Sequence, residues 1–140
     1  MYFLKMALNP IGTLLLLLLI VLNKENKELK MDLYRYNKEN NLKNLIKVFL
    51  NFKEFRNIFY YRAKKSSIIS KIAVKLCKLF YKEEGTLIIS CDNIKGGLFI
   101  QHGIATIITA SEIGENCQIN QQVTIGYNLN SGKPPVIGDN

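Results

Sequence analysis

Isoleucine recurs every six positions in the C-terminal part of the chain, and this spacing constrains the fold more than any other feature. The repeating positions are Ile107, Ile113, Ile119 and Ile125, with Ile137 twelve residues further on. A glycine follows three of these isoleucines. A helix repeats every 3.6 residues and a half-buried strand every two, so neither explains a period of six. Short stacked strands joined by turns do, which predicts a parallel β-helix of triangular section over residues 86–140.

The length of this segment corresponds to about three turns of such a coil, at three hexapeptides per turn. The step before Ile137 contains the turn-rich sequence NLNSGKPP, which predicts a loop leaving the coil. Between Ile100 and Ile107 the spacing is seven, so the repeat slips by one across the segment that holds His102. The chain stops inside a hexapeptide, without the cap that a stack of repeats needs. We therefore expect a β-helix truncated at its C-terminus, prone to aggregate and nearly inactive at this length.

The N-terminal residues 1–30 are predicted to form a hydrophobic leader and a polar linker. Residues 11–22, IGTLLLLLLIVL, are an uninterrupted apolar run. Twelve helical residues span about 18 Å, less than the roughly 30 Å core of a bilayer. Three interpretations stay open: a weak membrane anchor, a leader that precedes a true start at Met31, and a buried helix. If the run inserts, the lysine-rich sequence after it favours a cytoplasmic location for the remainder.

Residues 31–85 are predicted to be helical. Apolar residues recur with a period near 3.6 over residues 40–63, which predicts a helix there. A second helix is predicted over 67–82, with Ser66 or Ser67 as its N-cap and Gly85 after its end. The residues that line one face of this second helix are Ile69, Ile72, Leu76 and Leu79. Its lysines are interpreted as a solvated face, with a membrane-surface or anionic-polymer role as the alternative.

The charge is unevenly distributed along the chain. Residues 1–85 hold 17 lysines and arginines against 7 acidic residues, a net charge of +10, whereas residues 86–140 hold 2 against 4, a net of −2. This asymmetry argues against a uniformly basic nucleic-acid-binding protein, and we expect no nucleic-acid partner. Three cysteines without a CxxC pair argue against a disulfide scaffold or a zinc ribbon and suit a reducing compartment. A single histidine excludes a histidine-rich metal site, and we expect no metal.

His102 is the residue with the best claim to a chemical role. It lies among small and apolar neighbours at the one register slip of the repeat, where a side chain is more readily displayed than packed. A neutral imidazole is a suitable general base for activating a hydroxyl group. Cys77 and Cys117 are interpreted as buried structural thiols. The sequence GYNLNSGKP fails as a phosphate-binding loop, because its glycine spacing is wrong and Pro134 stands at the position of the required hydroxyl residue.

Two segments carry a family resemblance. The sequence GGLFIQHGIATIITASEIGENCQINQQVTIGYN, followed by PPVIGDN, resembles the catalytic half of the serine O-acetyltransferases, and EFRNIFYYR at 54–62 is similar to the helix that precedes it in that family. The family belongs to the hexapeptide-repeat acyltransferases, whose relatives in capsular polysaccharide gene clusters carry the same signature. The fold that the resemblance implies is α+β, with a short N-terminal helical region over 31–85 followed by a left-handed parallel β-helix over 86–140.

The function that the resemblance implies is acetyl-CoA-dependent transfer of an acetyl group to the hydroxyl of L-serine, a step of cysteine biosynthesis, in the cytoplasm or at the cytoplasmic face of the membrane. His102 would be the catalytic base, and Thr124 and Gly126 would lie beside the acetyl-CoA. The family also implies a homotrimer with active sites between neighbouring subunits. Backbone N–H groups at the turns can stabilise the oxyanion.

The sequence departs from the family pattern at three places. Gln101 stands where the serine enzymes have an aspartate and is the predicted acceptor-binding residue, and Pro134 stands where they have a second histidine. The acidic residue ahead of their first long helix has only Asp32 and Glu39 as loose counterparts. These departures leave two alternatives open: an O-acetyltransferase for a capsular or exopolysaccharide sugar, and a non-catalytic trimeric β-helix scaffold.

Overall fold

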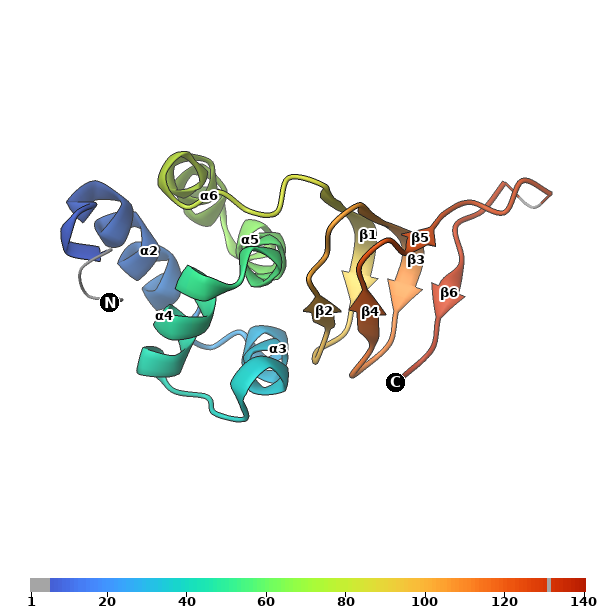
Figure 1. The fold of residues 1–140 in the computed structure, drawn as a ribbon, viewed down its shortest axis with the longest axis horizontal. Helices are drawn as coiled ribbons and strands as arrows, with labels where there is room; N and C mark the ends of the chain where they lie inside the picture. Colours follow the sequence, from blue (N-terminus) through green and yellow to red (C-terminus); the bar gives the residue numbers. More distant parts are fainter. Residues whose placement is uncertain (1–5, 131) are drawn as a thin grey trace.

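The computed structural model describes residues 6–130 and 132–140, so residues 1–5 of the predicted leader and Ser131 of the predicted loop lie outside it. Over the described residues five helices precede a set of short strands. The helices are α2 (Pro10–Asn23), α3 (Lys27–Asn37), α4 (Leu42–Asn51), α5 (Lys53–Ser66) and α6 (Ile68–Phe80). The strands are β1 (Leu87–Ile94), β2 (Phe99–Gln101), β3 (Thr106–Ile113), β4 (Gln118–Asn120), β5 (Thr124–Ile125) and β6 (Val136–Ile137). Helices gather at one end of the molecule and strands at the other (Figure 1).

The helix predicted over 40–63 is two helices, separated at Phe52. Phe52 adopts an extended backbone conformation, while its N–H still bonds the carbonyl of Val48 and so ends α4. This break lets the Phe52 ring contact Tyr36 of α3, at 5.6 Å between ring centroids. The second predicted helix is confirmed as α6, and the Ser67 hydroxyl caps it by accepting a hydrogen bond from the Ser70 N–H at 3.1 Å.

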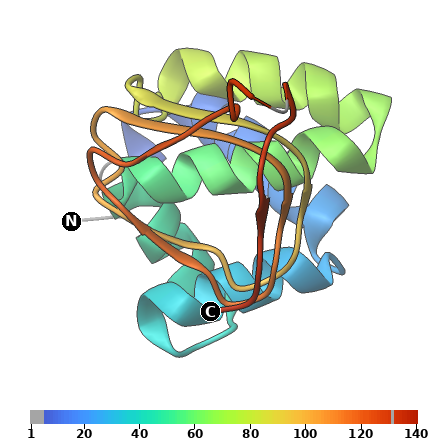
Figure 2. The ribbon, with the colours of Figure 1, turned by 90° about the vertical axis from the view of Figure 1, so that its right-hand side faces the viewer.

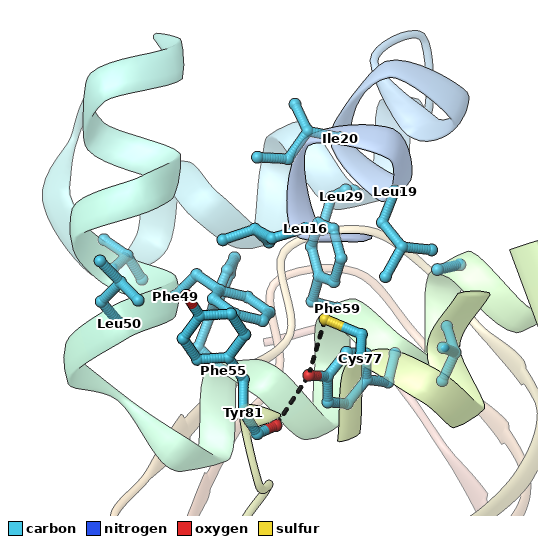
Figure 3. Packing of buried hydrophobic residues seen from close by; sticks show 14 of the residues in the cluster. Leu16, Leu19, Ile20, Leu29, Phe49, Leu50, Phe55, Phe59, Cys77 and Tyr81 are labelled. Carbon is cyan, nitrogen blue, oxygen red and sulfur yellow. Dashed lines mark hydrogen bonds between the residues drawn. The ribbon is translucent and has the colours of Figure 1, made fainter. Parts of the chain in front are cut away.

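The helical half has its own core, built from aromatic rings in edge-to-face contact (Figure 3). Phe49 contacts Phe59, Tyr60 and Tyr81 with centroid distances between 5.2 and 5.8 Å. Leu16 and Leu19 of α2 are fully buried in the same cluster. The apolar run of the predicted leader therefore contributes one face to this core. None of the described helices is long and apolar enough to cross a membrane.

The strands form two small parallel sheets. One has the order β1–β3–β5, with β6 also paired to β3, and the other contains β2 and β4. The segment from β1 onwards passes several times around a common apolar interior (Figure 2), filled by side chains such as Leu98, Ile100, Ile108 and Ile113. Ile58 of α5 is fully buried in this second cluster as well. The helical half thus closes one end of the strand-bearing half.

The predicted left-handed β-helix is wrong for this chain. Strands make up only about 21% of the residues, and they lie in small sheets after five helices. The pairing steps are 19 residues from Leu87 to Thr106 and 17 from Ile107 to Thr124, not a uniform 18. The register slip is the physical reason, because the extra residue turns Ile107 outward, 40% exposed, and buries Ile108 instead. One inward aliphatic residue every six positions therefore does not hold through the segment.

A buried ion pair joins the two halves. Arg62 of α5 donates from Nε to Asp32 Oδ2 of α3 at 2.9 Å, and both side chains are buried. Its remaining N–H groups donate to the carbonyls of Ile94 and Lys95, and Asp32 Oδ1 accepts from the Leu98 N–H at 2.8 Å. Burial raises the pKa of the Asp32 carboxyl, while Arg62 and the backbone N–H groups oppose that rise. All of these groups are satisfied only when helices and strands are docked.

Replacing Asp32 tests this junction. In Asp32→Ala the Arg62 guanidinium stays buried without a counter-charge, so we expect the free energy of unfolding in urea to fall by about 3–5 kcal/mol. The matched control is Glu25→Ala, which removes a carboxylate that is 80% exposed and pairs with Lys30. The control should leave the unfolding midpoint nearly unchanged. Equal stability of the two variants would contradict the role given to the pair.

Candidate functional site

His102 lies in the turn between β2 and β3, and its side chain is exposed. Its backbone is left-handed, with φ of 67°, and Gly103 follows with φ of 66°. The Gly103 N–H bonds the Gln101 carbonyl at 2.9 Å and closes the turn. Histidine tolerates this region better than most residues. A Cβ atom on Gly103 would lie 3.0 Å from Leu87 and 3.2 Å from Glu54, so glycine is needed where the turn meets the core. The turn therefore presents the imidazole to solvent from a tightly packed base.

Exposed neutral polar side chains lie on the paired strands β2 and β4, next to this turn. Gln101 pairs in register with Asn120. Gln118 donates to Gln101 Oε1 at 3.5 Å and to Asn120 Oδ1 at 3.2 Å. All three side chains are exposed. Amide groups both donate and accept hydrogen bonds, so this surface suits a ligand rich in hydroxyl groups.

Thr124 and Gly126 lie on a neighbouring part of the strand-bearing half. Thr124 is exposed in β5 and pairs with Ile107 at the start of β3. Gly126 follows β5, and a Cβ atom built there would meet no heavy atom within 4 Å. No packing within the described chain thus requires glycine at this position, and the space beside it is open. Among the described residues, no side-chain hydrogen bond joins Thr124 or Gly126 to Gln101 or His102.

The two acidic residues weighed from the sequence lie elsewhere. Asp32 is committed to Arg62, and Glu39 accepts a hydrogen bond from Asn41 in the connection between α3 and α4. The acidic residue that packs against the His102 turn is Glu54 of α5, which is 9% exposed and whose Cβ lies toward Gly103. Sequence reasoning missed Glu54, because a glutamate in the first turn of a helix is ordinarily a solvated residue that favours the helix dipole.

A cavity of about 610 Å³ lies where α5 and α6 face β1 and β3. None of the four predicted site residues lines it. Its helical wall carries Lys64, Lys65 and Lys78, and its strand wall carries hydroxyl groups such as that of Ser111. Burial lowers the pKa of Lys64, and the nearby charge of Lys78 lowers it further. No sequence signal distinguished these lysines from the many others in this half of the chain.

The three cysteines are free and buried, as predicted for Cys77 and Cys117. The Cys117 thiol donates to the Gly138 carbonyl at 3.0 Å, and the Tyr60 hydroxyl donates to Cys77 Sγ at 3.6 Å. Burial raises the pKa of all three thiols, including that of Cys91. Within residues 6–130 and 132–140, no group of three histidine, cysteine or acidic side chains is placed to hold a metal ion.

Comparison of the chain with protein-family models, curated proteins and solved structures finds no match. The resemblance to the serine O-acetyltransferases therefore remains a prediction that depends on the motif residues themselves.

The buried thiols give a direct chemical test. Because the thiolate is the reactive form and burial raises each thiol pKa, a disulfide reagent such as DTNB should label the native protein slowly at neutral pH. We expect labelling at least roughly tenfold slower than in concentrated urea, the factor that one pKa unit represents. A native cysteine that reacts as fast as in the unfolded chain would contradict the placement of that thiol in the core.

Proposed function

We propose that this chain is an acetyl-CoA-dependent O-acetyltransferase in which His102 is the general base. The observation that carries the proposal is an exposed imidazole on a turn that packs against Leu87 and Glu54 and that adjoins strands with exposed amide side chains. The motif resemblance supports acetyl-CoA as the donor and a homotrimer as the assembly. Three free thiols favour a reducing compartment, and we place the enzyme in the cytoplasm.

In this mechanism a neutral nitrogen of the His102 imidazole accepts the proton of the acceptor hydroxyl. The acceptor oxygen attacks the thioester carbonyl, and the carbon–sulfur bond breaks when the tetrahedral intermediate collapses. The imidazolium then returns its proton to the departing thiolate, so that free CoA thiol and an O-acetyl ester leave. Gly126 would let the pantetheine arm approach the backbone closely, and exposed Thr124 would donate a hydrogen bond to it.

Two observations bear on the identity of the acceptor, and they favour different molecules. Glu54 packs its Cβ toward Gly103 of the turn, and its carboxylate is the group that we propose pairs with the ammonium group of L-serine, our first candidate. The neutral face of Gln101, Gln118 and Asn120 favours the second candidate, a sugar hydroxyl of a capsular or exopolysaccharide precursor. The two acceptors are separable, because only the first carries a charge that Glu54 can recognise.

Replacing His102 by asparagine tests the base. Asparagine accepts the left-handed backbone but cannot take a proton at neutral pH, so kcat should fall by roughly 10²–10⁴. The assay is thiol release from acetyl-CoA with L-serine and with a panel of sugars. The control is Gln122→Asn, another exposed residue with positive φ, which should retain activity. Near-normal turnover of His102→Asn would remove His102 from the mechanism, and absence of release from the folded wild type with every acceptor would favour a non-catalytic scaffold.

The acceptor is tested at Glu54. If its carboxylate holds the ammonium group, Glu54→Gln should raise KM for L-serine by about tenfold, since a charge-assisted hydrogen bond contributes about 1.5–3 kcal/mol. KM for acetyl-CoA should not change, and the thermal midpoint reports whether the helix start is intact. Gln101→Asp is the reciprocal variant, and it should improve use of L-serine relative to a sugar. Unchanged KM for L-serine in both variants would count against an ammonium-binding site here.

A further inference from the structure

We propose that the outer face of α2 and α6 docks this protein onto the surface of an anionic membrane. The face on α6 consists of Ile68, Ile69, Ile72, Leu76 and Leu79, and all five side chains are exposed. This is the face that the sequence singles out, and the structure turns it away from the core. The positions that α6 buries instead are Ser70, Ala73, Val74 and Cys77. An exposed apolar stripe of this size marks an interaction surface.

α2 contributes a second exposed apolar stripe. Its members are Leu8, Ile11, Leu14, Leu18 and Val21, with Leu8 just ahead of the helix. Only one side of α2 is buried in the core, around Leu16 and Leu19. A helix that is apolar on all sides is normally enclosed by other structure or by lipid. The open side of α2 is therefore without a partner among the described residues.

The two stripes belong to neighbouring antiparallel helices. Near one end a Cβ atom on Gly12 would lie 2.8 Å from Phe80, and at the other end Asn23 donates to the Ser70 hydroxyl at 3.4 Å. Thr13 and Tyr81 exchange a further hydrogen bond of 3.3 Å. Figure 1 shows both helices at the helical end of the molecule, away from the strands. Phe80 is itself partly exposed beside Gly12, so the apolar surface continues from one helix to the other.

Charge decides between a membrane and a second copy of the chain. Neither α2 nor α6 contains an acidic residue. Lys71 and Lys75 each immediately precede an apolar member of the α6 stripe and are exposed, whereas Lys78 pairs with Glu83 on the side of the cavity. Two copies meeting through this face would bring like charges together, whereas lysines around an apolar face complement anionic headgroups. At 14 and 13 residues the helices suit a position in the headgroup region and are too short to span the bilayer.

The test is co-sedimentation of the full chain with vesicles of phosphatidylcholine, with and without one quarter phosphatidylglycerol. The wild type should pellet with the anionic vesicles, more weakly at high salt, and not with the neutral ones. In the double variant Ile72→Glu, Leu76→Glu, whose side chains are 56% and 46% exposed, the partition coefficient should fall by at least about tenfold. The matched control is Val136→Glu on β6, 72% exposed, which should bind like the wild type.

Three outcomes would overturn the proposal: no binding of the wild type to anionic vesicles, equal binding of the double variant, or a lipid-free dimer in sedimentation velocity that the double variant dissociates. Circular dichroism and the thermal midpoint establish that the double variant is folded. If that variant does not fold, Lys71→Glu combined with Lys75→Glu replaces it, because both lysines are exposed and their reversal should abolish binding to the anionic vesicles. Acetyl transfer is measured separately, so loss of membrane binding does not depend on the enzymatic proposal.

Discussion

The buried ion pair between Asp32 and Arg62 is the interaction on which the arrangement of the two halves depends. Both residues belong to helices, yet their remaining hydrogen bonds go to the backbone of Ile94 at the end of β1 and of Lys95 and Leu98 in the connection to β2. Removing two charges from water costs more than their attraction returns unless such additional bonds are made. The pair is therefore satisfied in one docked arrangement and unsatisfied in others, which gives the junction its specificity.

Residues of α3 and α5 at this junction also pack against the strand and turn that carry the candidate site. Tyr36 of α3 donates to the Ile100 carbonyl at 3.0 Å and accepts from the Ile100 N–H at 3.3 Å, one residue before Gln101. Glu54 of α5 packs against Gly103 on the other side of the turn. His102 itself contributes nothing to this support and faces solvent. A turn held by packing and hydrogen bonds on both sides keeps its exposed side chain in position without help from a ligand, as the proposed general base would need.

The sequence predicts a structural feature correctly where residues close together in the chain determine it. Ser67 caps α6 because its hydroxyl reaches a backbone N–H three residues on, and this needs no tertiary information. The face of α6 was not predictable in the same way: periodicity indicates an apolar side, but close helix packing selected Ala73 and Cys77 for the core and left Ile72 outside. The prediction of a regular β-helix from the isoleucine repeat was wrong for a related reason. The spacing alone does not determine which residue points inward after the register slip. No sequence signal indicated that Glu54 would pack against Gly103.

The uneven distribution of charge along the chain coincides with the boundary between the helical half and the strand-bearing half. The helical half carries the net charge of +10 and the open apolar face, and the strand-bearing half is nearly neutral and carries the turn with His102. Helices and strands occupy opposite ends of the molecule (Figure 1). If α2 and α6 lie on an anionic surface, the strand-bearing end extends away from it, into a region where its neutral polar face is open to dissolved acceptors. Under the two proposals, membrane docking and acyl transfer use separate surfaces, because none of the stripe residues of α2 and α6 belongs to the candidate site around His102.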